Sequence, residues 1–366
     1  MVRFLGCPDF FVTFSAADLH WDSLMRLYPP SVYQRWKDGE EQVRLRTARE
    51  GLRDNPQIAA THFVKRSNLY LNRFLVPKFG IIDHWFRYEW QARGSPHIHG
   101  FWINKDFSRY PPADITTPEC REALAGHLQY VVEAVHHFSQ HLAQMPRGRD
   151  PVAQSPEISG YSFLDLAQLL QVTQYHTRNE QYCLHKKKGS NEVSCRFYFP
   201  RPVADHAHFT LELNTRHWTF AAIRNDEVLN QYNRAIALSW RANHDITPCG
   251  DATAVINYMG KYCAKVEISP MTMQSIIKSV IPFPSNHNHR LSLFIRSLNR
   301  VLSERDISGQ ELQHYISDAP LYNSSRAVVY VDCRPWPPSY ENILQLLRIS
   351  KAEHPWPANI SPGLNH

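Results

Sequence analysis

The sequence predicts an α+β fold, and three observations point to it. Residues 10–14, Phe-Phe-Val-Thr-Phe, form an apolar run typical of a buried strand, which ends at a polar turn over residues 15–18. Residues 81–91 and 97–104 have strand patterns and are joined by Ala-Arg-Gly-Ser-Pro, which predicts a hairpin. Later stretches have helical spacing. Separate runs of strands and helices in one chain indicate the α+β class.

The predicted hairpin has one aromatic face. In its first strand Phe86, Tyr88 and Trp90 alternate with polar residues, so they share a face of the strand. The second strand, residues 97–104, has the sequence His-Ile-His-Gly-Phe-Trp-Ile-Asn.

Helical patterns follow the hairpin. Residues 120–145 have a helix-like pattern that ends in a Pro- and Arg-rich loop over residues 146–156. Gly250-Asp251 predicts a helix start, with Asp251 as N-cap. The last ninety or so residues are helix-then-strand in character, and the tail from about residue 355 is expected to be loose.

Composition limits the function classes. A net charge of +6 is compatible with a polyanionic partner but is too small to establish one. The sequence contains no apolar run long enough to cross a bilayer and no signal peptide, and its seven cysteines are scattered, so we expect an intracellular protein without a membrane partner. It has no GxxxxGK[ST] loop, so no nucleotide cofactor is expected.

His97 and His99 are the first candidate metal ligands. With twenty histidines in 366 residues, about one His-x-His pair is expected by chance, and the sequence has three: His97/His99, His206/His208 and His287/His289. The first pair alone lies in an apolar strand that faces a second strand.

A third ligand is expected from that neighbouring strand. If the hairpin is centred on Gly94, Gln91 lies opposite His97 and Glu89 lies opposite His99. Two imidazoles with a carboxylate or amide can hold one divalent metal and leave positions open for substrate. The sequence leaves the choice between Glu89 and Gln91 open.

Tyr258 and Tyr262 are spaced i, i+4 in Ile-Asn-Tyr-Met-Gly-Lys-Tyr-Cys-Ala-Lys, so on a helix their phenols share one face. Lys265 lies on that face and Lys261 beside it. Lysines and a metal-bound phosphate would favour the nucleophilic phenolate. Taken alone, the pair has a second interpretation, in which both tyrosines pack half-buried against a core.

A cysteine- and histidine-containing segment over residues 174–200 suggests a zinc site. His176, Cys183, His185 and Cys195 offer thiolate and imidazole ligands, which suit tetrahedral zinc. Their spacing matches no standard finger, and the cysteines can equally be reduced core residues.

Basic residues near these motifs are candidate DNA contacts. A lysine run within the zinc segment is usually a solvated loop but can also touch phosphates. The candidates are Lys186, Lys187, Lys188, Lys265 and Arg93.

Taken in order, several motifs resemble one family. They are residues 10–21 (FFVTFSAADLHW), 89–99 (EWQARGSPHIH), Cys183 with 195–200 (CRFYFP), 240–246 (WRANHDI) and Tyr258-x-x-x-Tyr262. Together they resemble the Rep-type HUH nuclease (helicase-like N-terminal) domain of Helitron transposases. The likeness extends through Ser308-Gly-Gln-Glu and Pro320-Leu-Tyr-Asn-Ser-Ser-Arg, and so covers about residues 5–331.

The resemblance implies roles for the motif residues. His97 and His99 would be the metal ligands, with Glu89 or Gln91 as the third. Tyr258 and Tyr262 would be paired nucleophiles, and Lys261 would contact the scissile phosphate. The implied cofactor is Mg²⁺ or Mn²⁺, and the resemblance also strengthens the expectation of Zn²⁺ at the cysteines.

The resemblance also implies an architecture: an HUH endonuclease-like central antiparallel sheet with flanking helices. We expect a nuclease core over residues 1–270, with the metal hairpin at about 81–104 and the tyrosine helix at about 251–266. An insertion over about 106–215 would contain the zinc-knuckle-like segment. A helical C-terminal extension would follow over 271–366.

The expected function is metal-dependent nicking and strand transfer of single-stranded DNA through a 5′-phosphotyrosine intermediate, as in rolling-circle transposition. In that family a PIF1-type helicase normally follows the nuclease, and none is present in this sequence, so a separate helicase is an expected partner. By resemblance, the expected location is the nucleus. Two alternatives are a catalytically silent DNA-binding module and an unrelated metallohydrolase.

Overall fold

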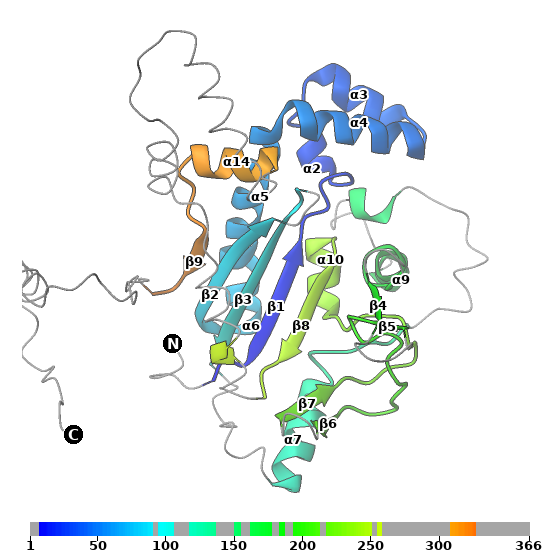
Figure 1. The fold of residues 1–366 in the computed structure, drawn as a ribbon, viewed down its shortest axis with the longest axis vertical. Helices are drawn as coiled ribbons and strands as arrows, with labels where there is room; N and C mark the ends of the chain where they lie inside the picture. Colours follow the sequence, from blue (N-terminus) through cyan, green and yellow to red (C-terminus); the bar gives the residue numbers. More distant parts are fainter. Residues whose placement is uncertain are drawn as a thin grey trace, which may run out of the picture. The chain divides into compact units, whose positions relative to one another are not determined.

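Five strands form an antiparallel sheet at the centre of the fold in the computed structural model (Figure 1). In spatial order they are β8 (His244–Pro248), β1 (Phe10–Ser15), β3 (Pro96–Asn104), β2 (Ile81–Trp90) and β9 (Tyr322–Ser324). The strand over residues 10–14 and the hairpin over residues 81–104 are therefore confirmed, as are the α+β class and the central antiparallel sheet.

The structure describes ten stretches of the chain, all within a unit that spans residues 1–326. They are residues 7–90, 94–105, 117–136, 150–154, 162–177, 183–186, 193–212, 217–250, 255–257 and 308–326. Among the described helices, none combines the length and the apolarity needed to cross a lipid bilayer.

Helices flank the sheet, and two small hairpins lie outside it (Figure 1). The helices are α2 (Asp22–Met25), α3 (Pro30–Asp38), α4 (Glu41–Asp54), α5 (Pro56–Tyr70), α6 (Val76–Phe79), α7 (Pro118–Leu128), α9 (Ser162–Thr173), α10 (Arg234–Trp240) and α14 (Gly309–Ile316). The π-helical segment η1 (Leu71–Leu75) and the 3-10 turn η4 (Pro151–Ala153) complete them. The hairpins are β4 (Leu184–Lys186) with β5 (Val193–Cys195), and β6 (His208–Glu212) with β7 (His217–Ala221).

The main core lies between one face of the sheet and helices α5 and α10. Phe14 of β1 meets Trp240 of α10 edge to face, with ring centroids 5.4 Å apart. Phe63 of α5 packs in the same manner on Tyr88 of β2, at 6.1 Å. The alternation of aromatic residues in β2 therefore does what the sequence predicts, because it aims one set of side chains into this core.

Buried polar contacts anchor the C-terminal end of α10, which leads into strand β8. The indole N–H of Trp240 donates to the carbonyl of Ser15 at 2.9 Å. Arg241 ends α10 in a left-handed conformation, with φ 56°, and its guanidinium binds both carboxylate oxygens of Asp165 on α9 at 2.6 and 2.7 Å. This paired, hydrogen-bonded charge lies in the interior, where loss of either partner would leave the other uncompensated.

One helix is shorter than the sequence predicts. The helical pattern over residues 120–145 predicts a single long helix, but α7 ends at Leu128. Beyond it, Glu133 bridges Tyr232 and Ala134 bridges Arg224. The backbone groups there are satisfied by pairing with a distant segment, which the local pattern does not encode.

Residues 308–326 pack on the central sheet, although the sequence places them in a C-terminal extension. Ser308 caps α14, and its hydroxyl accepts from the N–H of Glu311 at 3.1 Å, as expected of a Ser-x-x-Glu capping motif. His314 packs against Trp90 of β2, with ring centroids 4.8 Å apart. Strand β9 then pairs with β2 from Trp85 to Arg87.

Gly100→Ala should destabilise the protein by about 3 kcal/mol, because a Cβ at this position of β3 has no room. It would meet the ring of Phe86 at 2.1 Å and the carbonyl oxygen of Trp85 at 2.6 Å. Urea unfolding measures the change. Gly126→Ala in α7 is the control, since a Cβ there meets nothing within 4 Å and should be neutral or stabilising by up to about 1 kcal/mol. If both changes altered the free energy of unfolding equally, the close packing of Phe86 and Trp85 around Gly100 would be contradicted.

Candidate functional site

Strand β3 presents His97 and His99 on the sheet face opposite the main core. Alternate residues of a strand point the same way, and β3 lies between β1 and β2 at the middle of the sheet. The structure brings the two rings side by side, with centroids 6.4 Å apart and planes inclined by 23°. Ser15 lies opposite His97 and Thr13 opposite His99 on β1.

The hairpin register differs from the predicted one. Glu89 lies opposite His97 and Arg87 opposite His99, so the hairpin centre lies one residue before Gly94 and every partner shifts by two positions. Gly94 takes the left-handed region, with φ 86°, on the β3 side of the turn, and a Cβ there would meet the side chain of Ser308 at 2.8 Å. The glycine therefore marks an edge of the turn rather than its centre.

Glu89 remains close to both histidines despite this shift. One of its carboxylate oxygens, Oε2, lies 3.2 Å from Nε2 of His99, and both side chains are less than one-fifth exposed. Gln91, the other predicted third ligand, and Arg93 lie outside the described residues. Of the two candidates, Glu89 is the one whose position the structure gives.

Both histidines are held neutral. Burial and, to a smaller extent, the neighbouring His99 together lower the pKa of His97 to about 4. Burial also lowers the pKa of His99 to about 4, although the charge of Asp245 acts in the opposite direction. A neutral imidazole has the free lone pair that a metal needs, so the two rings are in the ligand form at pH 7.

Ser15 orients the first ring. Its hydroxyl lies 2.9 Å from Nδ1 of His97 and donates to the amide oxygen of Asn243 at 3.3 Å. Having used its proton, the hydroxyl accepts from Nδ1–H, which leaves Nε2 of His97 with its lone pair. Metal-binding histidines are usually held in this way through the other ring nitrogen.

Asp245 is a candidate that the sequence does not single out. It lies on β8 opposite Thr13, so one row across the sheet runs from Arg87 through His99 and Thr13 to Asp245. Its Oδ1 is buried and accepts no hydrogen bond. Burial raises the pKa of this carboxyl, while the charge of Arg201 lowers it. Its signals in the sequence are a short His-Asp-Ile-Thr strand pattern and its place in the motif over residues 240–246.

The predicted tyrosine helix is described only at its start. Residues 255–257 are helical, and Val255 is buried. Tyr258, Lys261, Tyr262 and Lys265 lie outside the described residues.

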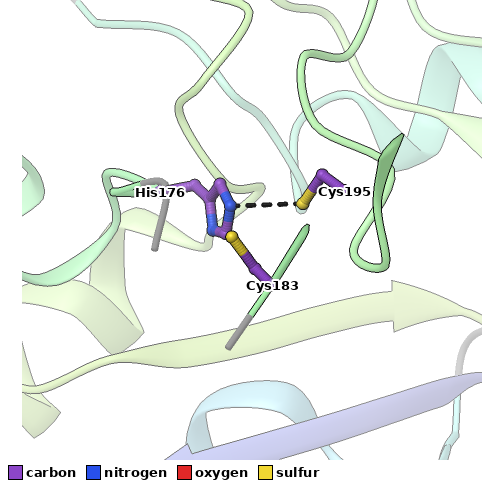
Figure 2. Close-up of side chains that lie close together, drawn as sticks. All are labelled: His176, Cys183 and Cys195. Atoms are coloured by element: carbon purple, nitrogen blue, oxygen red, sulfur yellow. Dashed lines mark hydrogen bonds between the residues drawn. The ribbon is translucent and has the colours of Figure 1, made fainter. Parts of the chain in front are cut away.

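A second cluster gathers His176, Cys183 and Cys195, as the sequence predicts (Figure 2). His176 follows α9, Cys183 precedes β4 and Cys195 ends β5. Their ligand atoms all lie within 4.8 Å of one another, and Nε2 of His176 is 3.3 Å from Sγ of Cys195. Among the described residues, this is the one group of three histidine, cysteine, aspartate or glutamate side chains whose ligand atoms all lie within 4.8 Å of one another. The ligand atoms of His97, His99 and Glu89 are therefore more widely spaced than this.

The cluster has its own small core. Both cysteines are buried with Phe199, whose ring stacks on His176 at 4.4 Å and 11°. In a tetrahedral zinc site, ligand atoms lie about 3.3–3.9 Å apart, given Zn–S and Zn–N bonds of about 2.3 and 2.1 Å. The spacing and softness of these donors fit zinc. His185 pairs with Ser194 through its backbone, and its side chain is not described.

The lysine run is only partly described. Lys186 ends β4, with its side chain outside the described residues, and Lys187 and Lys188 follow outside them.

Acid should destabilise the protein, because four histidines are buried in the neutral form with a pKa of about 4. They are His62, His97, His99 and His244. Each folded pKa lies below the unfolded value of about 6.5, so the stabilisation is complete above pH 6.5 and is lost as the pH falls towards 4. Each should lower the free energy of unfolding by about 2 kcal/mol at pH 5. Asp9 and Asp18, whose pKa burial raises to about 6, act oppositely but return only about 1.4 kcal/mol each.

Urea unfolding at pH 7.5 and pH 5 measures this loss, and His244→Gln isolates one contributor. His244 is fully buried, and its Nε2 accepts from the N–H of Asn233 at 3.3 Å, so protonation removes a hydrogen bond as well as charging a buried ring. The variant should lose about 2 kcal/mol less than the parent between the two pH values. His206→Gln, at an exposed histidine, should leave the difference unchanged. An unchanged pH dependence in His244→Gln would contradict the prediction.

The N-terminal part of the chain matches a known family model. The model, described as the Helitron helicase-like domain at N-terminus, matches residues 1–102. The chain is Helitron-related. No curated protein matches it. The match suggests a transposon-related function for this Helitron-related protein, and His97, His99 and Glu89 all lie within the matched residues.

Proposed function

We propose that this Helitron-related protein nicks single-stranded DNA and transfers the cut strand through a 5′-phosphotyrosine intermediate, as in rolling-circle transposition. The observation that carries the proposal is the pair of neutral histidines on the central strand, with the carboxylate of Glu89 3.2 Å from His99. All three lie in the stretch that the family model matches.

The residues of this face fit a divalent metal. Glu89 offers the carboxylate oxygen that Mg²⁺ or Mn²⁺ prefers, and Asp245 adds a second carboxylate with a buried oxygen that accepts no hydrogen bond. The two neutral imidazoles add nitrogen donors. His97, His99 and Glu89 would hold the ion. When bound, such an ion polarises a phosphate oxygen and stabilises the charge that develops on it.

Tyr258 and Tyr262 supply the nucleophiles in this proposal. The phenol oxygen attacks the phosphorus, the bond from phosphorus to the 3′ oxygen breaks, the phenol loses its proton and the 3′ oxygen gains one. The new phosphotyrosine bond keeps the energy of the broken diester, so the reverse reaction with another 3′-hydroxyl rejoins strands without a nucleotide cofactor. Lys261 and Lys265 would favour the phenolate and neutralise the phosphate.

The second cluster has a structural role in this proposal. His176, Cys183 and Cys195 would hold Zn²⁺ and join the β4–β5 hairpin to the end of α9. His185 is the proposed fourth ligand. A separate PIF1-type helicase remains the proposed partner.

The test is a search for a covalent adduct. Labelled single-stranded oligonucleotides are incubated with the protein and Mn²⁺, and a denaturing gel reports label that stays with the protein. The parent should give an adduct, and the Tyr258→Phe, Tyr262→Phe double variant should give none. Salt-sensitive binding without an adduct would replace the proposal with a silent DNA-binding module. Cleavage that persists in the double variant would indicate a metallohydrolase instead.

A further inference from the structure

The segment that follows β5 exposes aromatic rings between arginines. Its sequence from residue 196 is Arg-Phe-Tyr-Phe-Pro-Arg. Tyr198 is 83% exposed and Phe197 37% exposed, whereas Phe199 is buried against the cysteines. Phe199 therefore anchors the segment and Tyr198 faces solvent, while Phe197 is partly exposed and meets His176 edge to face at 5.8 Å.

Tyr198 is held in a conformation that tyrosine rarely adopts. Its φ is 62°, in the left-handed region, and its N–H donates to the carbonyl of Cys195 at 2.9 Å. This region disfavours a residue with a Cβ, and non-glycine residues held there are concentrated at functional sites. The backbone thus turns the ring of Tyr198 outward, where it contributes no core packing that would offset the strain.

Two arginines stack on aromatic rings of this segment. The guanidinium of Arg196 lies over Phe197 at 4.7 Å, and that of Arg201 lies over Phe199 at 4.6 Å. Between Cys183 and Val203 the chain has five lysines and arginines and one acidic residue, Glu192. A polyanion is the partner that this charge favours.

Arg201 of this segment also interacts electrostatically with the sheet face that carries His97 and His99. The charge of Arg201 lowers the pKa of Asp245, the carboxylate that in turn acts on His99.

We propose that Tyr198 and Phe197 form a stacking platform for unpaired bases of single-stranded DNA, with Arg196 and Arg201 contacting the adjoining phosphates. The proposal rests on the proposed function for its choice of single-stranded DNA. Aromatic side chains bind any unpaired base through its flat face, and neighbouring cations track the backbone. Bases in a duplex already stack on one another, so the platform selects single strands.

Fluorescence anisotropy with a labelled oligothymidylate tests the platform on the full chain, without added Mn²⁺. Tyr198→Ala should weaken binding about 5- to 100-fold, and Tyr198→Phe, which keeps the ring, should bind within twofold of the parent. Tyr198→Gly should weaken binding as much as alanine does while keeping or raising the melting temperature, because glycine takes a φ of 62° without strain. Tyr130→Ala is the matched control, since Tyr130 is 84% exposed outside this segment, and it should bind like the parent.

Salt dependence separates the two kinds of contact. Tyr198→Ala should weaken binding equally at all salt concentrations, whereas Arg201→Gln should make the dependence on log salt shallower by about 0.7. Two results would contradict the stacking platform. One is a Tyr198→Ala variant that binds the oligothymidylate within twofold of the parent. The other is a Tyr198→Ala variant that loses as much affinity for duplex DNA as for single-stranded DNA.

The adduct gel keeps this test distinct from that of the nuclease. Tyr198-dependent binding in a parent that forms no adduct supports the platform and removes the nuclease. If the parent forms an adduct and Tyr198→Ala binds single-stranded DNA as the parent does, the nuclease is supported and the stacking platform is contradicted.

Discussion

His99→Ala should slow formation of the covalent adduct with single-stranded DNA by about 10³-fold or more. A metal that stabilises the charge on a phosphate oxygen contributes several kcal/mol to the transition state, and about 1.4 kcal/mol corresponds to each factor of ten in rate. His99 is a neutral ligand candidate within 3.2 Å of Glu89, so its removal takes one of the donors and leaves that carboxylate without its neighbour. Adduct yield against time, at saturating oligonucleotide and Mn²⁺, measures the change.

The control keeps the hairpin and removes a different histidine. His84 lies on β2, and its Nε2 contacts Asn323 of β9 at 3.0 Å, on the opposite sheet face from His99. His84→Ala should keep adduct formation within a few-fold of the parent, whatever it does to stability. His97→Ala should behave like His99→Ala. If His84→Ala were as slow as the other two, the loss would reflect a disturbed sheet rather than a lost ligand. Undiminished activity of His99→Ala would remove the metal site from the proposal.

The parts of this site that the sequence predicts are those determined by local alternation. His97 and His99 share a face because residues two apart on a strand always do, and Phe-Phe-Val-Thr-Phe needs no partner to be recognised as a buried strand. The cluster of His176, Cys183 and Cys195 is also predicted, because thiolates and an imidazole in one segment suit tetrahedral zinc, although the sequence leaves reduced core cysteines as the alternative.

What the sequence does not predict depends on contacts between distant segments. The register of the hairpin is set by its turn, and Gly94 lies where Ser308, over two hundred residues away, leaves no room for a Cβ. Asp245 joins the histidine face because β8 pairs with β1, a choice made by the main core and not by the local pattern. The end of α7 at Leu128 likewise depends on bridges to residues beyond 220.

Cys195→Ala should reduce bound zinc from about one equivalent per chain to nearly none and lower the melting temperature by several degrees. Cys195 is buried, lies 3.3 Å from His176 and closes the hairpin through its pairing with Leu184. Structural zinc contributes about 10–16 kcal/mol of binding free energy in isolated fingers, and in a larger domain part of this stabilises the surrounding fold. Elemental analysis of the purified protein and thermal unfolding measure the two effects.

A cysteine outside the cluster provides the comparison. Cys120 lies on α7 and is a free thiol, so Cys120→Ala should keep the zinc and the melting temperature. Zinc absent from the parent, or retained by Cys195→Ala, would favour the other interpretation, in which the cysteines are reduced core residues.

Loss of zinc should also weaken binding to single-stranded DNA. The carbonyl of Cys195 accepts the N–H of Tyr198, and Phe199, which anchors the segment, stacks on His176. If the metal holds this arrangement, Cys195→Ala should weaken binding to an oligothymidylate about as much as Tyr198→Ala does, and combining the two changes should add little. Full additivity would show instead that the platform forms without the cluster, because changes at independent sites add and changes at coupled ones do not.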